Sequence, residues 1–259
     1  MTDTYKYKGK SFFILSFIIF MNIIKNKEPN LKKVSFKCDS KLHDRLDDIE
    51  IFKLMNKHNF TLFLGKAGSG KTSLLIQFLK SPSAFKCIFN QIFVFMPPNS
   101  RSSVSDNFFE KNLPEEQLFD ELNEENLQLV YDIAQENRLD GMKTLIILDD
   151  VQKSLKDNNV SKLLLHMVNN RRHASLSIWM CCLTYNSIPR QVRQGLTDLF
   201  IFKINKTEQE NIINEIMEYD KKQNEIINKN TFLKPHDFFY INTNSQRIFT
   251  NFDEMKFII

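Results

Sequence analysis

The chain has 259 residues, of which 42% are hydrophobic and 25% are charged, and its formal net charge is +4. This composition predicts a folded soluble protein and excludes a disordered chain, while the length allows one large domain or two small ones. The four cysteines, Cys38, Cys87, Cys181 and Cys182, lack the Cys-x-x-Cys spacing of a zinc site and do not suggest a disulfide framework. A reducing compartment is therefore the simpler interpretation.

The charge is distributed unevenly along the chain. Residues 106–140 contain eleven acidic and two basic residues, a net charge of −9, so the remainder carries +13. A basic remainder is compatible with a phosphate-rich partner such as DNA. Solvated lysines on an ordinary surface explain the same count equally well.

An apolar run from Phe12 to Ile24 lies near the start of the chain. It is shorter than the roughly 18–20 residues that a membrane-spanning helix needs, so no stable membrane span is expected. Three other interpretations stay open: a signal-peptide core, a buried or interfacial helix, and an upstream extension of a reading frame that begins at Met21. Residues 1–30 are therefore treated as a separate N-terminal segment without an assigned role.

Residues 31–259 are expected to form one domain, with its core at about residues 58–205. Two elements should lead into this core. Lys32 to Lys37 alternates like an edge strand, and Asp47 to Met55 has the spacing of a helix.

The most informative stretch begins with the apolar run Phe60 to Leu64 and continues into a Gly-x-x-x-x-Gly-Lys-Thr pattern. The expected nucleotide-binding residues are the eight of this pattern, Gly65, Lys66, Ala67, Gly68, Ser69, Gly70, Lys71 and Thr72, together with Ser73, which follows it. The pattern predicts a buried strand, a phosphate-binding loop and a helix from Lys71 to about Leu79. Small residues let backbone N–H groups surround phosphate oxygens, and the helix N-terminus favours anions. In such a loop Lys71 reaches the β- and γ-phosphates of ATP and Thr72 ligates Mg²⁺.

A second motif is the apolar run from Thr144 to Leu148, which ends in Asp149 and Asp150. The run predicts a buried strand that delivers two carboxylates at its C-terminal end, where ligands bind in open α/β sheets. Asp149 is expected to hold Mg²⁺ through water, and Asp150 is expected to act as the general base that polarises the attacking water.

Further elements complete an α/β pattern. The segment after Asp106 has apolar residues at helical spacing, beginning with Leu118, and its acidic residues are expected to form a solvated face. Strands are expected at Gln91–Met96, Leu176–Leu183 and Leu199–Lys203, helices at Val160–Asn170 and from a capping box at Thr207, and a hairpin at Asp237–Phe252 that turns near Asn244.

The order of these elements distinguishes the additional-strand ATPases from the branch of P-loop proteins that contains the kinases and GTPases. The Gln91–Met96 strand lies between the two motifs in the sequence, which predicts that an extra strand separates the two motif strands in the sheet. The expected fold is thus an α/β P-loop NTPase of the additional-strand type, with a mostly parallel sheet flanked by helices and a C-terminal helix and hairpin. A GTPase is disfavoured because Asn205-Lys206-Thr207-Glu208 lacks the Asp of the guanine motif.

From Thr61 to Phe202 the chain resembles the FtsK/HerA superfamily, and within it the genome-packaging ATPases of large eukaryotic DNA viruses, virophages and related transposons. The discriminating order is Arg172-His173, an apolar strand, Tyr185, Ile188-Pro189, Arg193 and an aromatic-rich strand. The resemblance implies ATP hydrolysis with Mg²⁺ at the subunit boundaries of a homo-oligomeric ring that drives double-stranded DNA into a capsid. It also implies a capsid vertex protein as partner, and a location in the host cytoplasm or viral factory, or in the virion.

By position, the resemblance places Arg172 where a basic residue acts in trans on a neighbour's γ-phosphate. Arg171, Arg190 and Arg193 remain alternatives, as does simple contact with DNA phosphates or solvent. The fourth core strand of this family usually ends in a sensor Gln, whereas this chain has Leu183 and Thr184 there. Thr184 and Asn186 are the remaining candidates for that role.

Two other functions fit the same motifs. One is a helicase or replication-initiation ATPase, and the other is a regulatory module that is switched by ATP with little turnover. The intact acidic pair, Asp149 and Asp150, argues against the second.

Overall fold

The computed structural model describes residues 20–24, 54–55, 58–104 and 108–258. The strand expected at Lys32–Lys37, and all but the end of the helix expected at Asp47–Met55, lie outside these residues.

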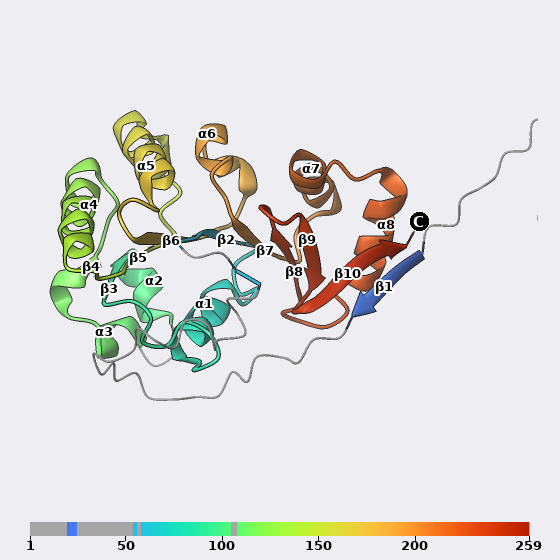
Figure 1. Cartoon of the computed structure of the whole chain (residues 1–259), viewed down its shortest axis with the longest axis horizontal. Helices are drawn as coiled ribbons and strands as arrows, with labels where there is room; N and C mark the ends of the chain where they lie inside the picture. The colour runs from blue at the N-terminus through green and yellow to red at the C-terminus, as the bar shows by residue number, and fades with distance from the viewer. Residues whose placement is uncertain (1–19, 25–53, 56–57, 105–107, 259) are drawn as a thin grey trace, which may run out of the picture.

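A single mixed sheet organises the described residues (Figure 1). Its ten strands stand in the order β1-β10-β9-β8-β7-β2-β6-β5-β3-β4. The strands are β1 (Phe20–Ile24), β2 (Phe60–Leu64), β3 (Gln91–Phe95), β4 (Leu118–Phe119), β5 (Thr144–Asp149), β6 (Leu176–Cys182), β7 (Asp198–Phe202), β8 (Phe238–Asn242), β9 (Arg247–Thr250) and β10 (Asp253–Ile258). The half from β7 to β4 is parallel throughout, and the half from β7 to β1 is antiparallel.

Helices cover both faces of the parallel half (Figure 1). One face of the parallel half carries α4 (Glu124–Leu139), α5 (Asn158–Asn170) and α6 (Arg190–Arg193), and the other carries α1 (Lys71–Lys80), α2 (Pro98–Ser102) and α3 (Phe108–Asn112). Helix α7 (Lys206–Met217) lies over β8 and β9 of the antiparallel half, on the same side of the sheet as α6. Helix α8 (Lys221–Asn230) precedes β8, and three short 3₁₀ turns, η4 (Glu115–Gln117), η5 (Ser154–Lys156) and η6 (Tyr185–Ser187), lie in connections.

The central strand β2 shows how the sequence produces these layers. All five of its residues are buried, and alternate side chains join different cores. Leu62 packs with the core under α4 and α5, whereas Phe63 packs with the aromatic core under α1. A strand covered on both faces is expected to be almost entirely apolar, and in β2 only Thr61 departs from that pattern.

The structure confirms the additional-strand prediction but changes its reason. The strand between β2 and β5 is β6, which comes later in the chain, and β3 lies on the outer side of β5. The additional-strand class was therefore predicted correctly, but the prediction placed β3 between the two motif strands, where the structure has β6. Buried strands of similar length and composition do not encode their neighbours locally.

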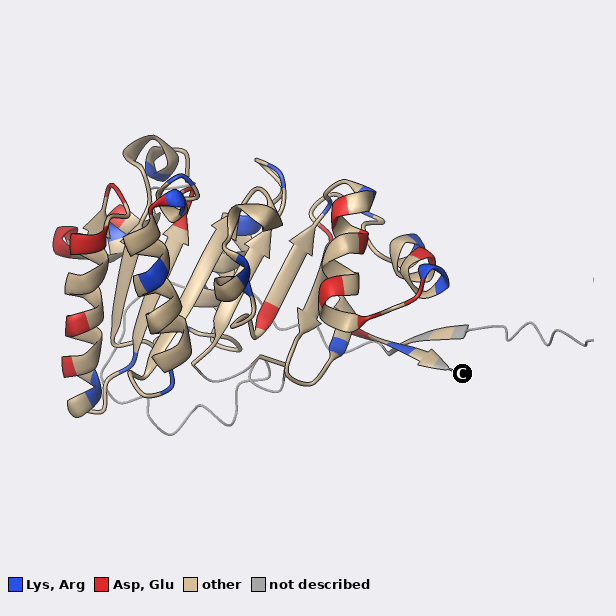
Figure 2. Cartoon of the chain, turned by 90° about the horizontal axis from the view of Figure 1, so that it is seen from above, with Lys and Arg blue, Asp and Glu red and all other residues tan. Residues whose placement is uncertain are grey.

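Two helix predictions were wrong in detail. Leu118, expected in a helix, lies in β4, and the helix begins at Glu124, where the Asn123 side chain accepts a hydrogen bond from the Asn126 amide. Helix α7 is capped by Asn205, which accepts from the Glu208 amide, and not by Thr207. The acidic residues of α4 do form an exposed face, as Figure 2 shows.

The C-terminal hairpin is confirmed as β8 and β9, with its turn at residues 243–246. The sequence did not predict β10 or the pairing of β1 with it. Helix was one interpretation of the Phe12–Ile24 run, but its last five residues form an antiparallel edge strand; the others lie outside the described residues. Among the helices that the structure describes, none is long and apolar enough to span a membrane.

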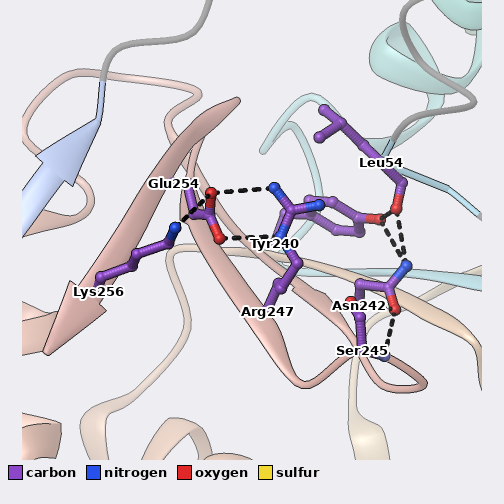
Figure 3. Close-up of polar contacts among 7 residues, drawn as sticks. All are labelled: Leu54, Tyr240, Asn242, Ser245, Arg247, Glu254 and Lys256. Carbon is purple, nitrogen blue, oxygen red and sulfur yellow. Dashed lines mark hydrogen bonds and ion pairs between the residues drawn. The ribbon is translucent and has the colours of Figure 1, made fainter.

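Polar contacts anchor the chain before β2 to the antiparallel half (Figure 3). The Tyr240 hydroxyl and the Asn242 amide both lie 2.7 Å from the Leu54 carbonyl oxygen. The same tyrosine hydroxyl lies 2.7 Å from a carboxylate oxygen of the fully buried Asp198. These contacts fix the start of the nucleotide-binding half against the sheet.

Candidate nucleotide-binding site

The phosphate loop lies between the buried strand β2 and helix α1. Gly70 has φ +108°, and Gly68 has φ +73°, conformations that favour glycine. A Cβ on Gly65 would lie 2.7 Å from both Phe202 Cβ and Ser69 Oγ, so glycine is required there for space. No side chain caps the N-terminus of α1. The N–H groups at the start of α1 are therefore available to an anion.

Lys71 is the first residue of α1 and is almost buried. Its ammonium group donates hydrogen bonds to the carbonyl oxygens of Gly65 and Lys66, both at 2.9 Å. These bonds hold the cation across the mouth of the loop. A phosphate oxygen is a stronger acceptor for an ammonium group than a neutral carbonyl.

Thr72 and Asp149 join the two sequence motifs. The Thr72 hydroxyl donates a 2.7 Å hydrogen bond to an Asp149 carboxylate oxygen at the end of β5. Burial raises the pKa of Asp149, and the Thr72 hydrogen bond and the nearby Lys71 ammonium partly oppose that shift. An anionic carboxylate in this position is favoured by a cation beside it.

Asp150 follows Asp149 directly, is exposed, and lines the same pocket as Asp149 and Lys71. Its backbone has φ +57°, a left-handed conformation that aspartate tolerates better than most residues. The Ser100 hydroxyl donates a 2.7 Å hydrogen bond to the Asp150 carboxylate. The two carboxylates at this sheet edge therefore have different partners, a threonine for Asp149 and a serine for Asp150.

A pocket of about 1000 Å³ contains the loop and both carboxylates. The antiparallel half supplies part of its wall, through His236, Phe238 and Phe252. His236 Nδ1 lies 3.0 Å from the carbonyl oxygen of Ser69 in the phosphate loop. The pocket is thus built from both halves of the sheet.

The described residues fit ATP and Mg²⁺. The start of α1 has no side-chain cap, and Gly68, Gly70 and Lys71 line the pocket, so backbone N–H groups and an ammonium group are available there to phosphate oxygens. Thr72 and Asp149 would hold Mg²⁺, because hydroxyl and carboxylate oxygens are the ligands that this cation prefers. Residues 65–73 would bind the phosphates.

The arginine candidates occupy different environments. Arg172 is exposed in the turn before β6, at the edge where the parallel strands begin, so it lies at the opposite edge of the sheet from Lys71. Arg171 is buried and donates to the carbonyl oxygens of His58 and Val168, which makes it structural. Arg193 stacks on Tyr185 and pairs with Glu215. Arg190 is exposed at the start of α6.

The sensor position also differs from expectation. Leu183 lines the pocket, whereas Thr184 and Asn186 do not. The Asn186 side chain instead accepts a hydrogen bond from Arg193. Gln152 also lines the pocket, although it belongs to no recognisable sequence motif. Ser100 and His236 were also missed, since neither belongs to a recognisable motif.

The sequence pattern of the family described as Poxvirus A32 protein matches residues 50–247. The chain belongs to this family. No curated protein sequence matches the chain. The family assignment, together with the complete pair of motifs, supports the prediction of an FtsK/HerA-type packaging ATPase and of its enzyme class.

Solved structures confirm the fold. B204, described as the DNA-packaging ATPase of Sulfolobus turreted icosahedral virus, is 18% identical with a TM-score of 0.57, over 75% of this chain and 97% of its own. B204 of Sulfolobus turreted icosahedral virus 2, described as a genome-packaging NTPase in complex with AMP, is 16% identical with a TM-score of 0.56, over 76% and 98%. The same protein with AMPPCP gives 17% and 0.56, over 74% and 96%.

Proposed function

We propose that this member of the poxvirus A32 family is an ATP-driven motor that moves double-stranded DNA and packages a viral genome into a capsid. The observation that carries the proposal is the convergence of the two motifs at one sheet edge, through the Thr72–Asp149 hydrogen bond. The solved structures of B204, which are described as a genome-packaging NTPase and a DNA-packaging ATPase, also support a packaging function. A basic remainder of the chain outside residues 106–140 suits a polyphosphate partner.

In this proposal each residue of the site has one task. Lys71 leaves its two loop carbonyls and binds the β- and γ-phosphates. Thr72 and Asp149 hold Mg²⁺, which when bound supplies positive charge next to the phosphate oxygens. Asp150 accepts a proton from the attacking water at a carboxylate oxygen.

We further propose a homo-oligomeric ring in which Arg172 acts on a neighbour's nucleotide. Arg172 lies at the sheet edge opposite its own phosphate loop, so only a neighbouring subunit's site is open to it. A cation supplied in trans neutralises charge that develops during phosphoryl transfer and is worth ~10³–10⁵ in rate in other systems. A capsid vertex protein as docking partner and a location in the host cytoplasm or viral factory belong to the same proposal.

The test is the ATPase rate of the full chain with and without double-stranded DNA at two salt concentrations. DNA should raise the rate, and the stimulation should weaken steeply at the higher salt because phosphate contacts release counterions. Lys71→Ala should abolish turnover, and Asp150→Asn should reduce it by ~10²–10⁴-fold, the usual worth of a general base. Lys111→Ala, an exposed lysine on α3 outside the pocket, is the matched control and should leave the rate unchanged.

Three outcomes would contradict parts of the proposal. Normal turnover in Lys71→Ala would refute the site assignment, and a wild-type rate that ignores DNA would refute the motor. Unwinding of a forked duplex would indicate a helicase instead, since packaging requires no strand separation.

A further inference from the structure

The exposed pair formed by Ser100 and Asp150 adds a residue to the hydrolytic site that no motif includes. Ser100 lies in α2, and its hydroxyl donates a 2.7 Å hydrogen bond to Oδ2 of Asp150. Both residues line the nucleotide pocket. Among the described residues, this hydroxyl is the one hydrogen-bond partner of the Asp150 carboxylate.

The sheet explains why these two distant residues meet. Strands β3 and β5 are parallel neighbours, with Phe95 beside Leu148 near their C-terminal ends. Asp150 follows β5 directly, and α2 follows β3 after Met96 and Pro97. Because parallel neighbours end at the same sheet edge, the first turn after β3 lies beside the carboxylate after β5.

The rest of α2 holds Ser100 in place. Pro98, the first residue of α2, has a φ angle fixed near the helical value, which favours a helix start at this point, with only two residues between β3 and α2. The Arg101 side chain is largely buried and pairs with the Asp120 carboxylate, which follows β4, and it approaches Glu110 at 3.8 Å. The hydroxyl is therefore carried by a segment tied to the neighbouring part of the sheet.

Asp150 needs such a partner because its exposed position does not otherwise constrain the rotamer of its carboxylate. The residue is exposed, and its left-handed backbone places it beyond the end of β5. A free carboxylate there samples several rotamers, whereas a general base must keep an oxygen toward the water that it deprotonates. A hydroxyl bonded to one carboxylate oxygen leaves the other oxygen free to accept that proton.

We propose that Ser100 is a positioning residue that fixes the orientation of the Asp150 carboxylate inside the nucleotide pocket. The proposal rests on the proposed function, in which Asp150 is the general base. Ser100 does not itself touch the reacting atoms in this scheme. Its loss should therefore slow the chemical step without weakening nucleotide binding.

The experiment compares steady-state ATP hydrolysis by wild type, Ser100→Ala, Ser100→Thr and Ser102→Ala. Ser102 is the matched control, because it is an exposed serine in the same helix whose hydroxyl bonds only the Asn99 carbonyl and does not line the pocket. Ser100→Ala should lower kcat about tenfold with KM for ATP within about twofold, the pattern of an interaction that acts in the transition state. Ser100→Thr should restore most of kcat, and Ser102→Ala should match wild type.

A crystal structure of ligand-free Ser100→Ala supplies a readout independent of activity. It should show the Asp150 carboxylate in more than one rotamer, whereas wild type and Ser102→Ala show one. A wild-type or faster kcat in Ser100→Ala, a single unchanged Asp150 rotamer, or failure of Ser100→Thr to recover would overturn the inference.

The outcomes also separate this inference from the proposed function. If Asp150→Asn loses turnover while Ser100→Ala keeps it, Asp150 remains the base and only the role of Ser100 is refuted. If wild type does not hydrolyse ATP, both proposals are refuted together.

Discussion

Arg171 and Arg172 are adjacent in the chain but occupy opposite environments. Arg171 is 9% exposed and donates two hydrogen bonds to backbone carbonyls, at 2.9 Å to His58 and 2.6 Å to Val168. Arg171→Ala should therefore lower the free energy of unfolding by about 3 kcal/mol, because it removes charged hydrogen bonds and buried packing. Arg172→Ala should change it by less than about 0.5 kcal/mol, as for an ordinary surface residue.

Denaturant unfolding of the two variants checks this prediction, and each serves as the control for the other. Equal destabilisation would show that the environments are not distinct. ATPase measurements on Arg172→Ala then report on the proposed trans role without a confounding loss of stability. ATPase measurements on Arg171→Ala would not report on a catalytic role, because loss of folded protein alone would lower the activity.

At the residue scale, local spacing predicted which side chains lie at the pocket. Lys71 and Thr72 follow from the loop that contains them, and Asp149 from the end of a buried strand, and all three line the same pocket. Ser100 was not predicted, because it contacts a residue 50 positions away in the sequence. The two arginines were indistinguishable because burial depends on which strands and loops pack beside them.

At the scale of elements, β9 and β10 are joined by an ion pair that Figure 3 shows. Arg247 donates to both carboxylate oxygens of Glu254, at 2.9 and 3.0 Å, and Lys256 lies 3.6 Å away. The Arg247 hydrogen bond lowers the pKa of Glu254. Because the folded pKa is below the unfolded one, the stabilisation is present above the ordinary value of 4.5 and is lost as pH falls through the lowered pKa.

Glu254→Gln should therefore cost about 1 kcal/mol of unfolding free energy at pH 7, a modest value because the Arg247 side chain is 37% exposed. The difference from wild type should shrink steadily below pH 4.5. Unfolding titrations at a series of pH values test this. Glu136→Gln, on the exposed face of α4, is the control, and a difference that stays constant down to pH 3 would contradict the assigned cause.

Elements were predicted well where their own residues specify them. The apolar runs of β2, β5 and β6 are buried on both faces, so composition alone revealed them. β10 was missed because its six residues form neither a continuous apolar run nor a strict alternation of apolar and polar side chains, so its pairing with neighbouring strands decides its structure. Strand order depends on such nonlocal pairing, which is why β6, and not β3, separates the two motif strands.

At the scale of the whole molecule, the nucleotide pocket couples the parallel and antiparallel halves of the sheet. Residues 65–73 form the loop that we propose binds the phosphates, and residues 231–237 reach it through His236, whose Nδ1 lies 3.0 Å from the Ser69 carbonyl oxygen. Phe238 and Phe252 extend the same wall. A ligand that contacts both halves stabilises both, since binding favours the closed native state over local openings.

A non-hydrolysable ATP analogue should therefore slow amide hydrogen exchange in two separate segments, residues 65–73 and residues 231–237. Helix α4 lies on the face of the sheet opposite to α1, and its amides should exchange at the same rate with and without the analogue (Figure 1). His236→Ala should remove the added protection at residues 231–237 while leaving that of the phosphate loop, because the imidazole contact with Ser69 is the link between them. Protection confined to residues 65–73 in the wild type would show instead that the antiparallel half does not respond to the nucleotide.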